Sequence, residues 1–311
     1  MRVASGRPWG VMLAGGDGIR LRPLTVRIAG DERPKQFCRI VGRHTLVEQT
    51  ERRLAIAVPP ERRLVVLTRA HESFYGPVLG GMTAAPLVQP RNRGTAPAVL
   101  YALLRIARTA PTARVVFLPS DHYVSDDGAF MAHVEAAFEA VAARPDLVVL
   151  LGVAADGPEP HYGWIEPGHA IGTPRAERVS RIRRFWEKPP PALAEELWTR
   201  GCVWNSFVMV GGVPTLLSLM RQALPELWDA FATAGPAIGT PREDEMIREL
   251  YATRSPVNFS REVLATRPAN LGVLRVSGVD WCDWGAPDRV LATLTRRGIQ
   301  PDWAAAVAEP A

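Results

Sequence analysis

Short apolar runs alternate along this chain with longer segments in which apolar residues recur at helical spacing. The apolar runs predict strands at residues 9–14, 64–68, 87–88, 114–118, 147–153, 179–186, 203–209 and 271–276. The helical spacing predicts helices at residues 45–57, 71–79, 98–108, 127–143, 190–200, 214–224, 225–232, 242–251 and 286–297. This alternation predicts an α/β fold with a mostly parallel central sheet and helices on both faces.

Composition limits the classes of protein to which the chain can belong. Its 311 residues are 47% hydrophobic, enough for one large α/β domain or two smaller ones. No run of 18 apolar residues predicts a membrane span, and residues 1–8 lack the apolar stretch of a secretory signal. Cys38, Cys202 and Cys282 are scattered without metal-ligand spacing, as in reduced proteins. We therefore expect a cytoplasmic protein with no membrane partner.

The distribution of charge argues against nucleic acid as a partner. The net charge is +5 and the isoelectric point about 9.5. The arginines are dispersed and few aromatic residues lie among them, so solvated helix faces explain them better than a nucleic-acid surface. Of the 37 basic residues, only Lys35 and Lys188 are lysines. A lysine kept in such an arginine-rich chain indicates a position that needs a compact ammonium group.

The stretch after the first predicted strand has the composition of an anion-binding loop. Gly15, Gly16 and Gly18 let the backbone turn sharply, and consecutive N–H groups in such a turn can hold an anion. Arg20 can bond two phosphate oxygens, and Lys35 adds a mobile cation. The loop lacks the third glycine of a dinucleotide fingerprint and the Gly-Lys-Ser/Thr ending of a P-loop. We therefore interpret it as a third kind of nucleoside triphosphate site.

The residues of this loop closely match a known signature. Residues 13–25 read L-A-G-G-D-G-I-R-L-R-P-L-T, and residues 34–37 read P-K-Q-F. Together they resemble the signature of the sugar-1-phosphate nucleotidyltransferases, and within that family most of all the mannose-1-phosphate guanylyltransferases. The resemblance implies a single large Rossmann-like nucleotidyltransferase domain, similar to the GT-A fold.

The same resemblance assigns roles to the residues of the loop. It implies that Leu13 and the three glycines bind the nucleotide, and that Arg20 and Lys35 take part in catalysis. Arg20 would hold the leaving pyrophosphate, and Lys35 would lie over the triphosphate. Ile19 departs from the signature, which usually has threonine there and so one more hydroxyl in the loop.

A second loop, which begins at Gln89, resembles the part of the guanylyltransferases that faces the base. Residues 93–98 read R-G-T-A-P-A, where thymidylyl and uridylyl relatives carry other residues. The resemblance makes Gln89, Gly94 and Thr95 the candidates for base recognition. Thr95 is also expected to cap the helix at 98–108, whose free N–H groups and dipole favour an anion.

Two aspartates are expected to hold a magnesium ion. Asp121 follows the strand at 114–118, and ligands of open α/β sheets lie at the carboxyl ends of strands. Its motif, P-S-D-H, resembles that of the family, and W-C-D-W-G resembles the family's W-x-D-x-G. The resemblance makes Asp121 and Asp283 the ligands of Mg²⁺, a cation that prefers carboxylate and phosphate oxygens. His122 is expected to support the site without touching the metal.

Three further motifs resemble the part of the family that binds the sugar phosphate. Gly163, in H-Y-G-W-I-E, would let the backbone approach sugar hydroxyls. In W-E-K-P, Glu187 would accept hydrogen bonds from the sugar, and Lys188 would bind its phosphate and orient it for attack. Asn205 can offer both a donor and an acceptor to a hydroxyl.

The third of these motifs departs from the family pattern. Residues 204–209 read W-N-S-F-V-M where the family has W-N-S-G-x-F, so no glycine follows Ser206. The missing glycine predicts a shortened turn and leaves the identity of the sugar open.

The motifs also suggest how the domain is divided. Residues 1–297 are expected to form the nucleotidyltransferase domain, with a nucleotide half at 9–153 and a sugar-phosphate half with a closing helix at 154–297. The helices between residues 214 and 251 are expected to cap the sugar side. Residues 298–311 are expected to be a frayed tail. The resemblance covers roughly residues 9–297, so we expect no β-helix or fused isomerase domain of the kind that some members of the family carry.

The reaction that the resemblance implies is nucleotidyl transfer from GTP to mannose 1-phosphate, which gives GDP-mannose and pyrophosphate. Other sugar 1-phosphates stay open, as do the pathway and a homo-oligomeric state. A glycosyltransferase of similar architecture is a weaker hypothesis, because Ser120-Asp121-His122 lacks the D-x-D of those enzymes. A non-catalytic sensor of nucleotide sugars is a third hypothesis, but it would not need Arg20, Lys188 and both aspartates.

Overall fold

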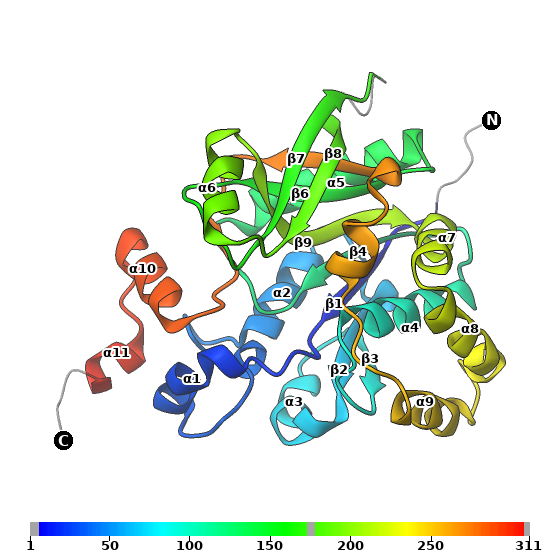
Figure 1. Cartoon of the computed structure of the whole chain (residues 1–311). Helices are drawn as coiled ribbons and strands as arrows, with labels where there is room; N and C mark the ends of the chain where they lie inside the picture. The colour runs from blue at the N-terminus through cyan, green and yellow to red at the C-terminus, as the bar shows by residue number, and fades with distance from the viewer. Residues whose placement is uncertain (1–5, 173–177, 308–311) are drawn as a thin grey trace.

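A nine-stranded β-sheet runs through the centre of the molecule (Figure 1). The computed structural model describes residues 6–172 and 178–307, and its strands lie in the order β3-β2-β1-β4-β9-β6-β10-β8-β7. These strands are β1 (Trp9–Leu13), β2 (Arg63–Thr68), β3 (Ala85–Gln89), β4 (Arg114–Pro119), β6 (Val148–Ala154), β7 (Gly163–Ala170), β8 (Val179–Glu187), β9 (Val203–Gly212) and β10 (Leu271–Val276). Each strand expected from the apolar runs is present, with ends shifted by a few residues.

The sheet is mixed, and its two halves differ in strand direction. β3, β2, β1 and β4 are parallel, as expected, and so are β6 and β10. β9 lies antiparallel between β4 and β6, and β8 is antiparallel to both β7 and β10. A parallel pair needs a crossover of roughly a dozen residues or more. Because β7 ends at residue 170 and β8 begins at residue 179, no such crossover fits between them.

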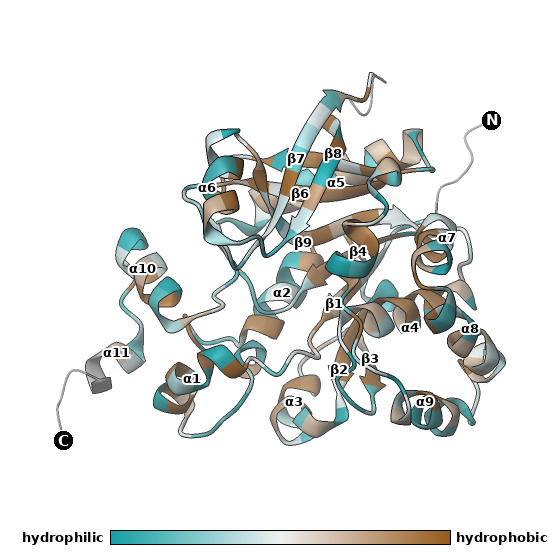
Figure 2. Cartoon of the chain, viewed as in Figure 1, coloured by the Kyte–Doolittle hydropathy of each residue, from teal (hydrophilic) through white to brown (hydrophobic). Residues whose placement is uncertain are grey.

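Helices cover both faces of the sheet, as the sequence predicts. One face carries α2 (Leu46–Leu54), α3 (Glu72–Leu79), α5 (Asp127–Ala143) and α6 (Pro191–Thr199), whose buried residues form one hydrophobic cluster. The other carries α4 (Thr95–Ala107), α7 (Val213–Ala223), α8 (Pro225–Ala234) and α9 (Glu243–Ala252). In Figure 2 the central strands, such as β1, β2 and β9, are mainly brown, whereas much of β7 and β8 is teal or white. This periodic burial explains why the residue ranges of the helices could be predicted from spacing alone.

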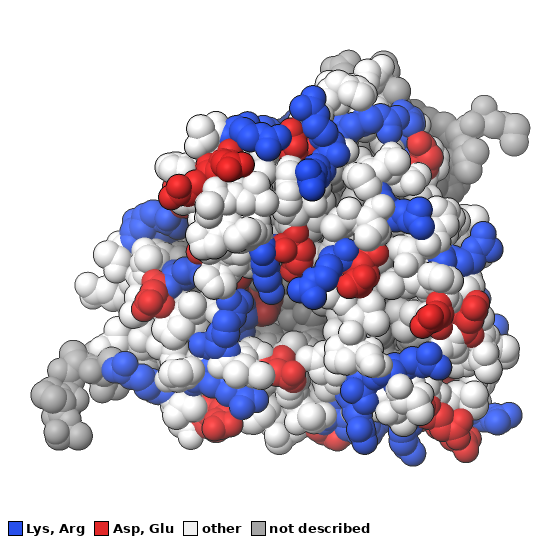
Figure 3. Space-filling model, viewed as in Figure 1, with Lys and Arg blue, Asp and Glu red and all other residues white. Residues whose placement is uncertain are grey.

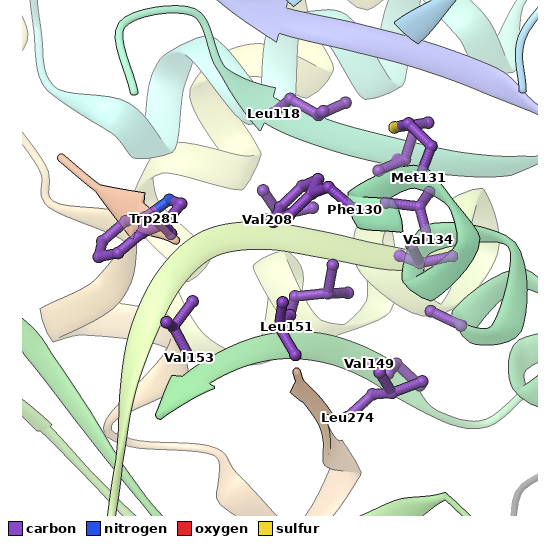
Figure 4. Close-up of a cluster of buried hydrophobic side chains, with 14 of the residues drawn as sticks. Leu118, Phe130, Met131, Val134, Val149, Leu151, Val153, Val208, Leu274 and Trp281 are labelled. Atoms are coloured by element: carbon purple, nitrogen blue, oxygen red, sulfur yellow. The ribbon is translucent and has the colours of Figure 1, made fainter. Parts of the chain in front are cut away.

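A close view of the first cluster shows how the sheet and α5 share their side chains. Phe130, Met131 and Val134 of α5 lie over Leu118 of β4 and Val208 of β9 (Figure 4). All five are buried. Continuous burial of strand residues on both faces of a sheet gives apolar runs rather than alternation, which is what the sequence showed for these strands.

Three short helices form a third cluster beside the sheet. They are α1 (Arg22–Ala29), α10 (Pro287–Arg297) and α11 (Asp302–Val307). α11 lies in the segment expected to be a frayed tail, and its Trp303 donates from Nε1 to the Ile40 carbonyl at 2.8 Å. The division of the chain into two functional halves stays a prediction. No helix within residues 6–172 and 178–307 is long and apolar enough to cross a membrane.

The helices α7, α8 and α9 are not where the sequence placed them. We expected a cap over the sugar side, but they stack along α4, on the side of the predicted base loop (Figure 1). Glu243 of α9 accepts hydrogen bonds from Tyr101 and Arg105 of α4. The apolar faces of these helices pack in the same cluster as α4. Sequence spacing identifies an amphipathic helix but not the element against which its apolar face packs.

A buried ion pair joins α2 to α5. Arg53 is 3% exposed, and its Nε lies 2.6 Å from Oδ1 of Asp127, at the start of α5. Burial lowers the pKa of Arg53, and the Asp127 carboxylate opposes that shift. Asp127→Asn should lower the free energy of unfolding by about 2 kcal/mol, because it leaves a buried cation without its partner while Asp127 itself reaches solvent.

Denaturant titration measures this loss. The double variant Arg53→Met/Asp127→Asn should recover most of it, since an apolar side chain needs no counter-charge. The matched control is Asp146→Asn, which removes the carboxylate of an exposed ion pair with Arg144. Its denaturation midpoint should be unchanged. A midpoint equally unchanged in Asp127→Asn would show that the buried pair does not hold the two helices together.

Candidate active site

The carboxyl ends of β1 and β4 open into a cavity of about 660 Å³. Thirteen of the fifteen site residues predicted from the sequence line it. They are Leu13, Gly15, Gly16, Arg20, Gln89, Gly94, Thr95, Asp121, Gly163, Glu187, Lys188, Asn205 and Asp283. The other two, Gly18 and Lys35, line an adjoining cavity of about 380 Å³ that shares Arg20, Asp121 and Asp283 with the first. Figure 3 shows a hollow in this face with basic and acidic side chains side by side at its rim.

The glycine loop after β1 is held by a residue of the P-K-Q-F motif. Nε2 of the buried Gln36 donates to the carbonyls of Ala14 and Gly16, at 3.0 and 2.7 Å. A Cβ on Gly15 would come within 2.9 Å of both Gln89 Nε2 and Thr68 Oγ1. A side chain therefore does not fit at residue 15, and the backbone of the loop faces the cavity directly.

An aspartate that the sequence did not single out ties the glycine loop to the base loop. Asp17 accepts from Asn92 Nδ2 at 2.9 Å, and Asn92 Oδ1 accepts from the Gly94 N–H at 3.0 Å. Asp17 also lies 3.1 Å from Nε2 of His71, whose pKa is lowered by burial. Nothing in the local sequence pattern marks this network, because its members come from three separate loops.

The predicted base-reading residues lie together at the start of α4. Gln89 is 2% exposed, and its Oε1 accepts from the Tyr251 hydroxyl at 2.9 Å. This bond fixes the orientation of the amide and turns Nε2 toward the loop at Gly15. Gly94 has φ of 83°, and a Cβ there would overlap the Val257 carbonyl, so glycine is required.

The predicted capping role of Thr95 is wrong. Gly94 occupies the N-cap position of α4, and Thr95 is the first helical residue. Thr95 Oγ1 accepts from the Phe259 N–H at 2.9 Å. The helix begins three residues earlier than expected, because Pro97 is tolerated in the first turn, where its missing N–H costs nothing.

The segment around residue 258 lines the cavity from the base loop to the predicted sugar motifs. The Val257 N–H donates to the Arg93 carbonyl at 2.9 Å, and the Val257 carbonyl accepts from Ala96 at 3.1 Å. Asn258, the next residue, lines the cavity together with Glu187 of the predicted sugar side. These contacts were not predicted from the sequence, because they join segments that are far apart in the chain.

A two-residue ladder brings the predicted metal ligands together. β5 (Tyr123–Val124) pairs antiparallel with β11 (Trp281–Cys282), with Tyr123 opposite Cys282. Asp121 and Asp283 stand just outside this ladder, and Nζ of the buried Lys35 lies between them. It is 3.2 Å from Asp121 Oδ2 and bonds the carbonyls of Asp283 and Trp284. Lys35 thus contacts the aspartates here, whereas the resemblance placed it over the triphosphate.

The two carboxylates have the chemistry that a hard divalent cation requires. Burial tends to raise the pKa of Asp283, but Lys35, Arg289 and His122 outweigh it and hold the pKa below its usual value. Asp283 Oδ1 accepts from the Tyr162 hydroxyl and lies 3.1 Å from Arg289 Nη1. Within the described ranges no group of three or more His, Cys, Asp or Glu side chains is placed to hold a metal ion.

The predicted sugar-phosphate residues gather where β7, β8 and β9 meet. Gly163 pairs with Glu187, and a Cβ on Gly163 would lie 3.2 Å from both Glu187 Oε2 and Asn205 Cβ. Burial raises the pKa of Glu187, while Lys188, Arg261 and Asn258 partly offset the shift. Lys188 is half exposed, with Nζ 3.9 Å from Glu187 Oε1 and a left-handed backbone at φ 51°.

The turn after Asn205 holds a left-handed residue at the position where the family pattern has glycine. Phe207 stands there and adopts φ of 59°, and the shortened turn stays a prediction. An L-residue in this region costs roughly 1–2 kcal/mol relative to the right-handed conformation. The Phe207 N–H donates to Asn205 Oδ1 at 3.1 Å. This bond uses the amide oxygen that we expect to accept from a sugar hydroxyl, so the Nδ2 donor becomes the main group that Asn205 offers to the cavity.

Comparisons with known proteins agree with this geometry. A family model described as nucleotidyl transferase matches residues 9–291. XanB, a xanthan biosynthesis protein of Xanthomonas campestris pv. campestris, is 34% identical over 224 residues, which are 71% of this chain and 45% of XanB. A mannose-1-phosphate guanylyltransferase of Escherichia coli is 28% identical over 242 residues, 76% of this chain and 49% of the relative. The chain thus spans about half the length of the curated relatives it matches.

A solved structure matches over a larger share of both chains. The structure described as mannose-1-phosphate geranyltransferase from Thermus thermophilus has a TM-score of 0.76 and 32% sequence identity. The match covers 90% of this chain and 76% of that one. It confirms the fold that the glycine-loop signature implied. By its sequence match, its architecture and the arrangement of its loops, the chain belongs to the nucleotidyl transferase family.

Proposed function

We propose that the chain transfers a nucleotidyl group from GTP to mannose 1-phosphate, giving GDP-mannose and pyrophosphate. One observation carries this proposal: a single cavity is lined by the glycine loop, the base loop, the sugar motifs and the aspartate pair. Each of these four elements would bind a different part of the two substrates. The guanylyltransferase of Escherichia coli among the relatives supports the choice of base and sugar.

The order of residues along the cavity supports a direct transfer between the two substrates. Lys188 would hold the sugar phosphate so that one of its oxygens attacks the α-phosphorus of the nucleotide. A bond forms from that oxygen to phosphorus, while the bond to the β-phosphate oxygen breaks and pyrophosphate leaves toward Arg20. No general base is needed, because a phosphate monoester is already anionic at neutral pH. Such a reaction depends on positioning and on electrostatic stabilisation.

The aspartate pair and Lys35 would supply that stabilisation at the triphosphate. Mg²⁺, when bound at Asp121 and Asp283, would neutralise charge that develops on the phosphate oxygens. Tyr162 and Arg289 hold Oδ1 of Asp283, so that its other oxygen is free to bind the metal. Lys35, whose Nζ contacts the Asp121 carboxylate and the Asp283 carbonyl, would reduce the repulsion between the two carboxylates.

Release of pyrophosphate from a matrix of nucleoside triphosphates and sugar 1-phosphates tests the proposal. GTP with mannose 1-phosphate should give the highest kcat/KM, because a buried hydrogen bond to the base discriminates by about 10⁴-fold when its partner is absent. Tyr251→Phe, which frees the Gln89 amide to rotate, should narrow the preference for GTP over ATP. A higher kcat/KM with dTTP or UTP for every sugar would contradict the assignment of the base.

The aspartate pair can be tested by single substitutions. Asp121→Asn and Asp283→Asn should each lower kcat by about a thousandfold, since each removes a charge that holds the metal at the phosphates. Both variants should also bind Mn²⁺ more weakly in the presence of GTP, as measured by electron paramagnetic resonance. Asp280→Asn, a nearby surface carboxylate paired with Arg297, is the matched control. Normal turnover in Asp283→Asn at saturating Mg²⁺ would exclude that residue from the metal site.

The two lysines differ in burial, and Lys→Arg should affect them differently. At Lys188 a guanidinium imposes a fork where a point charge is needed, and displacement by about 1 Å can cost about a hundredfold in rate. Steady-state kinetics of Lys188→Arg should therefore show a raised KM for sugar 1-phosphate and a lowered kcat, with the KM for GTP unchanged. Lys35→Arg should act mainly on the triphosphate and metal. Unaltered kinetics in Lys188→Arg would mean that this lysine does not bind the phosphate.

A further inference from the structure

Phe207 lines the substrate cavity, yet the roles described so far do not require it. It follows Asn205 by two residues on β9 and is partly buried. Its φ of 59° lies in the left-handed region, which favours glycine because a Cβ there crowds the following carbonyl. A bulky residue held in this conformation at a site is a reason to ask what its side chain does there.

The backbone around Phe207 is fixed by its neighbours rather than by Phe207 itself. Besides the bond from the Phe207 N–H to Asn205, Ser206 Oγ accepts from the Val208 N–H at 3.2 Å and donates to the Leu151 carbonyl at 2.7 Å. The pairing of β9 with β6 shifts register between Leu150 and Gly152 of β6, so β9 carries a bulge at this point. A bulge redirects the side chain it carries, here into the cavity.

The ring of Phe207 is fixed in place by a second aromatic ring. It meets Phe259 edge to face, with ring centroids 6.1 Å apart and planes at 75°. Phe259 is fully buried, and its N–H donates to Thr95 Oγ1 in the base loop. The Phe207 ring is therefore a rigid apolar surface between the sugar motifs and the base loop.

We propose that Phe207 is a specificity-determining residue of the sugar 1-phosphate subsite. Its ring occupies space beside Asn205 that glycine, the residue best suited to this backbone, would leave open. A hydroxyl on the sugar reaches the Asn205 amide past this ring, whereas an acetamido group needs both more volume and a partner for its own N–H. The ring offers neither, so the subsite selects sugars with free hydroxyls over their acetamido counterparts. This inference rests on the proposed nucleotidyl transfer.

Phe207→Gly tests the inference, because glycine adopts φ of 59° without strain and the variant should fold. The assay compares sugar 1-phosphates that differ only in one hydroxyl replaced by an acetamido group. Suitable pairs are mannose with N-acetylmannosamine 1-phosphate and glucose with N-acetylglucosamine 1-phosphate. The ratio of kcat/KM values should move about tenfold toward the acetamido sugar, the range expected when a pocket gains or loses a few atoms. The KM for the nucleotide should stay unchanged, which a general structural defect would not allow.

Two further variants separate the ring from the backbone. Phe207→Asn also tolerates the left-handed conformation and removes the ring, so it should shift the ratio in the same direction. Phe207→Tyr keeps the ring and should retain the wild-type preference. An unchanged ratio in Phe207→Gly and Phe207→Asn proteins with normal melting curves would overturn this inference and leave the proposed function standing. A wild-type protein that releases no pyrophosphate with any substrate pair would overturn both.

Discussion

The short ladder between β5 and β11 is the constraint on which the site depends most. It joins two segments that are far apart in the chain and places Asp121 and Asp283 on the same cavity. Two antiparallel residues are far too few to be stable alone. The ladder persists because stacking of Tyr123 on Trp284, at 4.9 Å, and the ammonium of Lys35 join its flanks. The Lys35 ammonium thus both stabilises the ladder and sets the charge at the candidate metal site.

Residues that are far apart in the chain combine to form each predicted subsite. The amide of Gln89 is oriented by Tyr251 of α9, and the base loop bonds Val257 and Phe259 from the second half. Asn258, between Val257 and Phe259, lines the cavity together with Glu187. Residues 257–259 therefore contact the base loop and also border the predicted sugar motifs.

The sequence predicted most strands of the central sheet, most helices and the residues that surround the cavity, because these depend on local spacing and on one long signature. It did not predict β5 and β11, which are too short to show a pattern. It could not predict the position of α7, α8 and α9, because helical spacing does not identify the element against which an apolar face packs. It missed Asp17 and Asn92, which become neighbours only through folding. It also assigned Thr95 as a cap when its hydroxyl has a tertiary partner. The errors therefore fall where long-range contacts override local preference.

Backbone strain in this molecule is concentrated where substrate is expected. Among the described residues, the non-glycine residues with positive φ are Lys188, Phe207 and Trp284. Each is a predicted site residue or lies within two positions of one. Lys188 directly follows β8, Phe207 lies within β9, and Trp284 comes two residues after β11. Such conformations persist only where surrounding bonds determine them, as the Asn205 and Ser206 bonds do around Phe207. At Lys188 and Phe207, stability that a regular strand would have provided is given up, and both side chains line the cavity. Trp284 is instead fully buried and stacks on Tyr123, so its strained backbone supports the β5–β11 ladder.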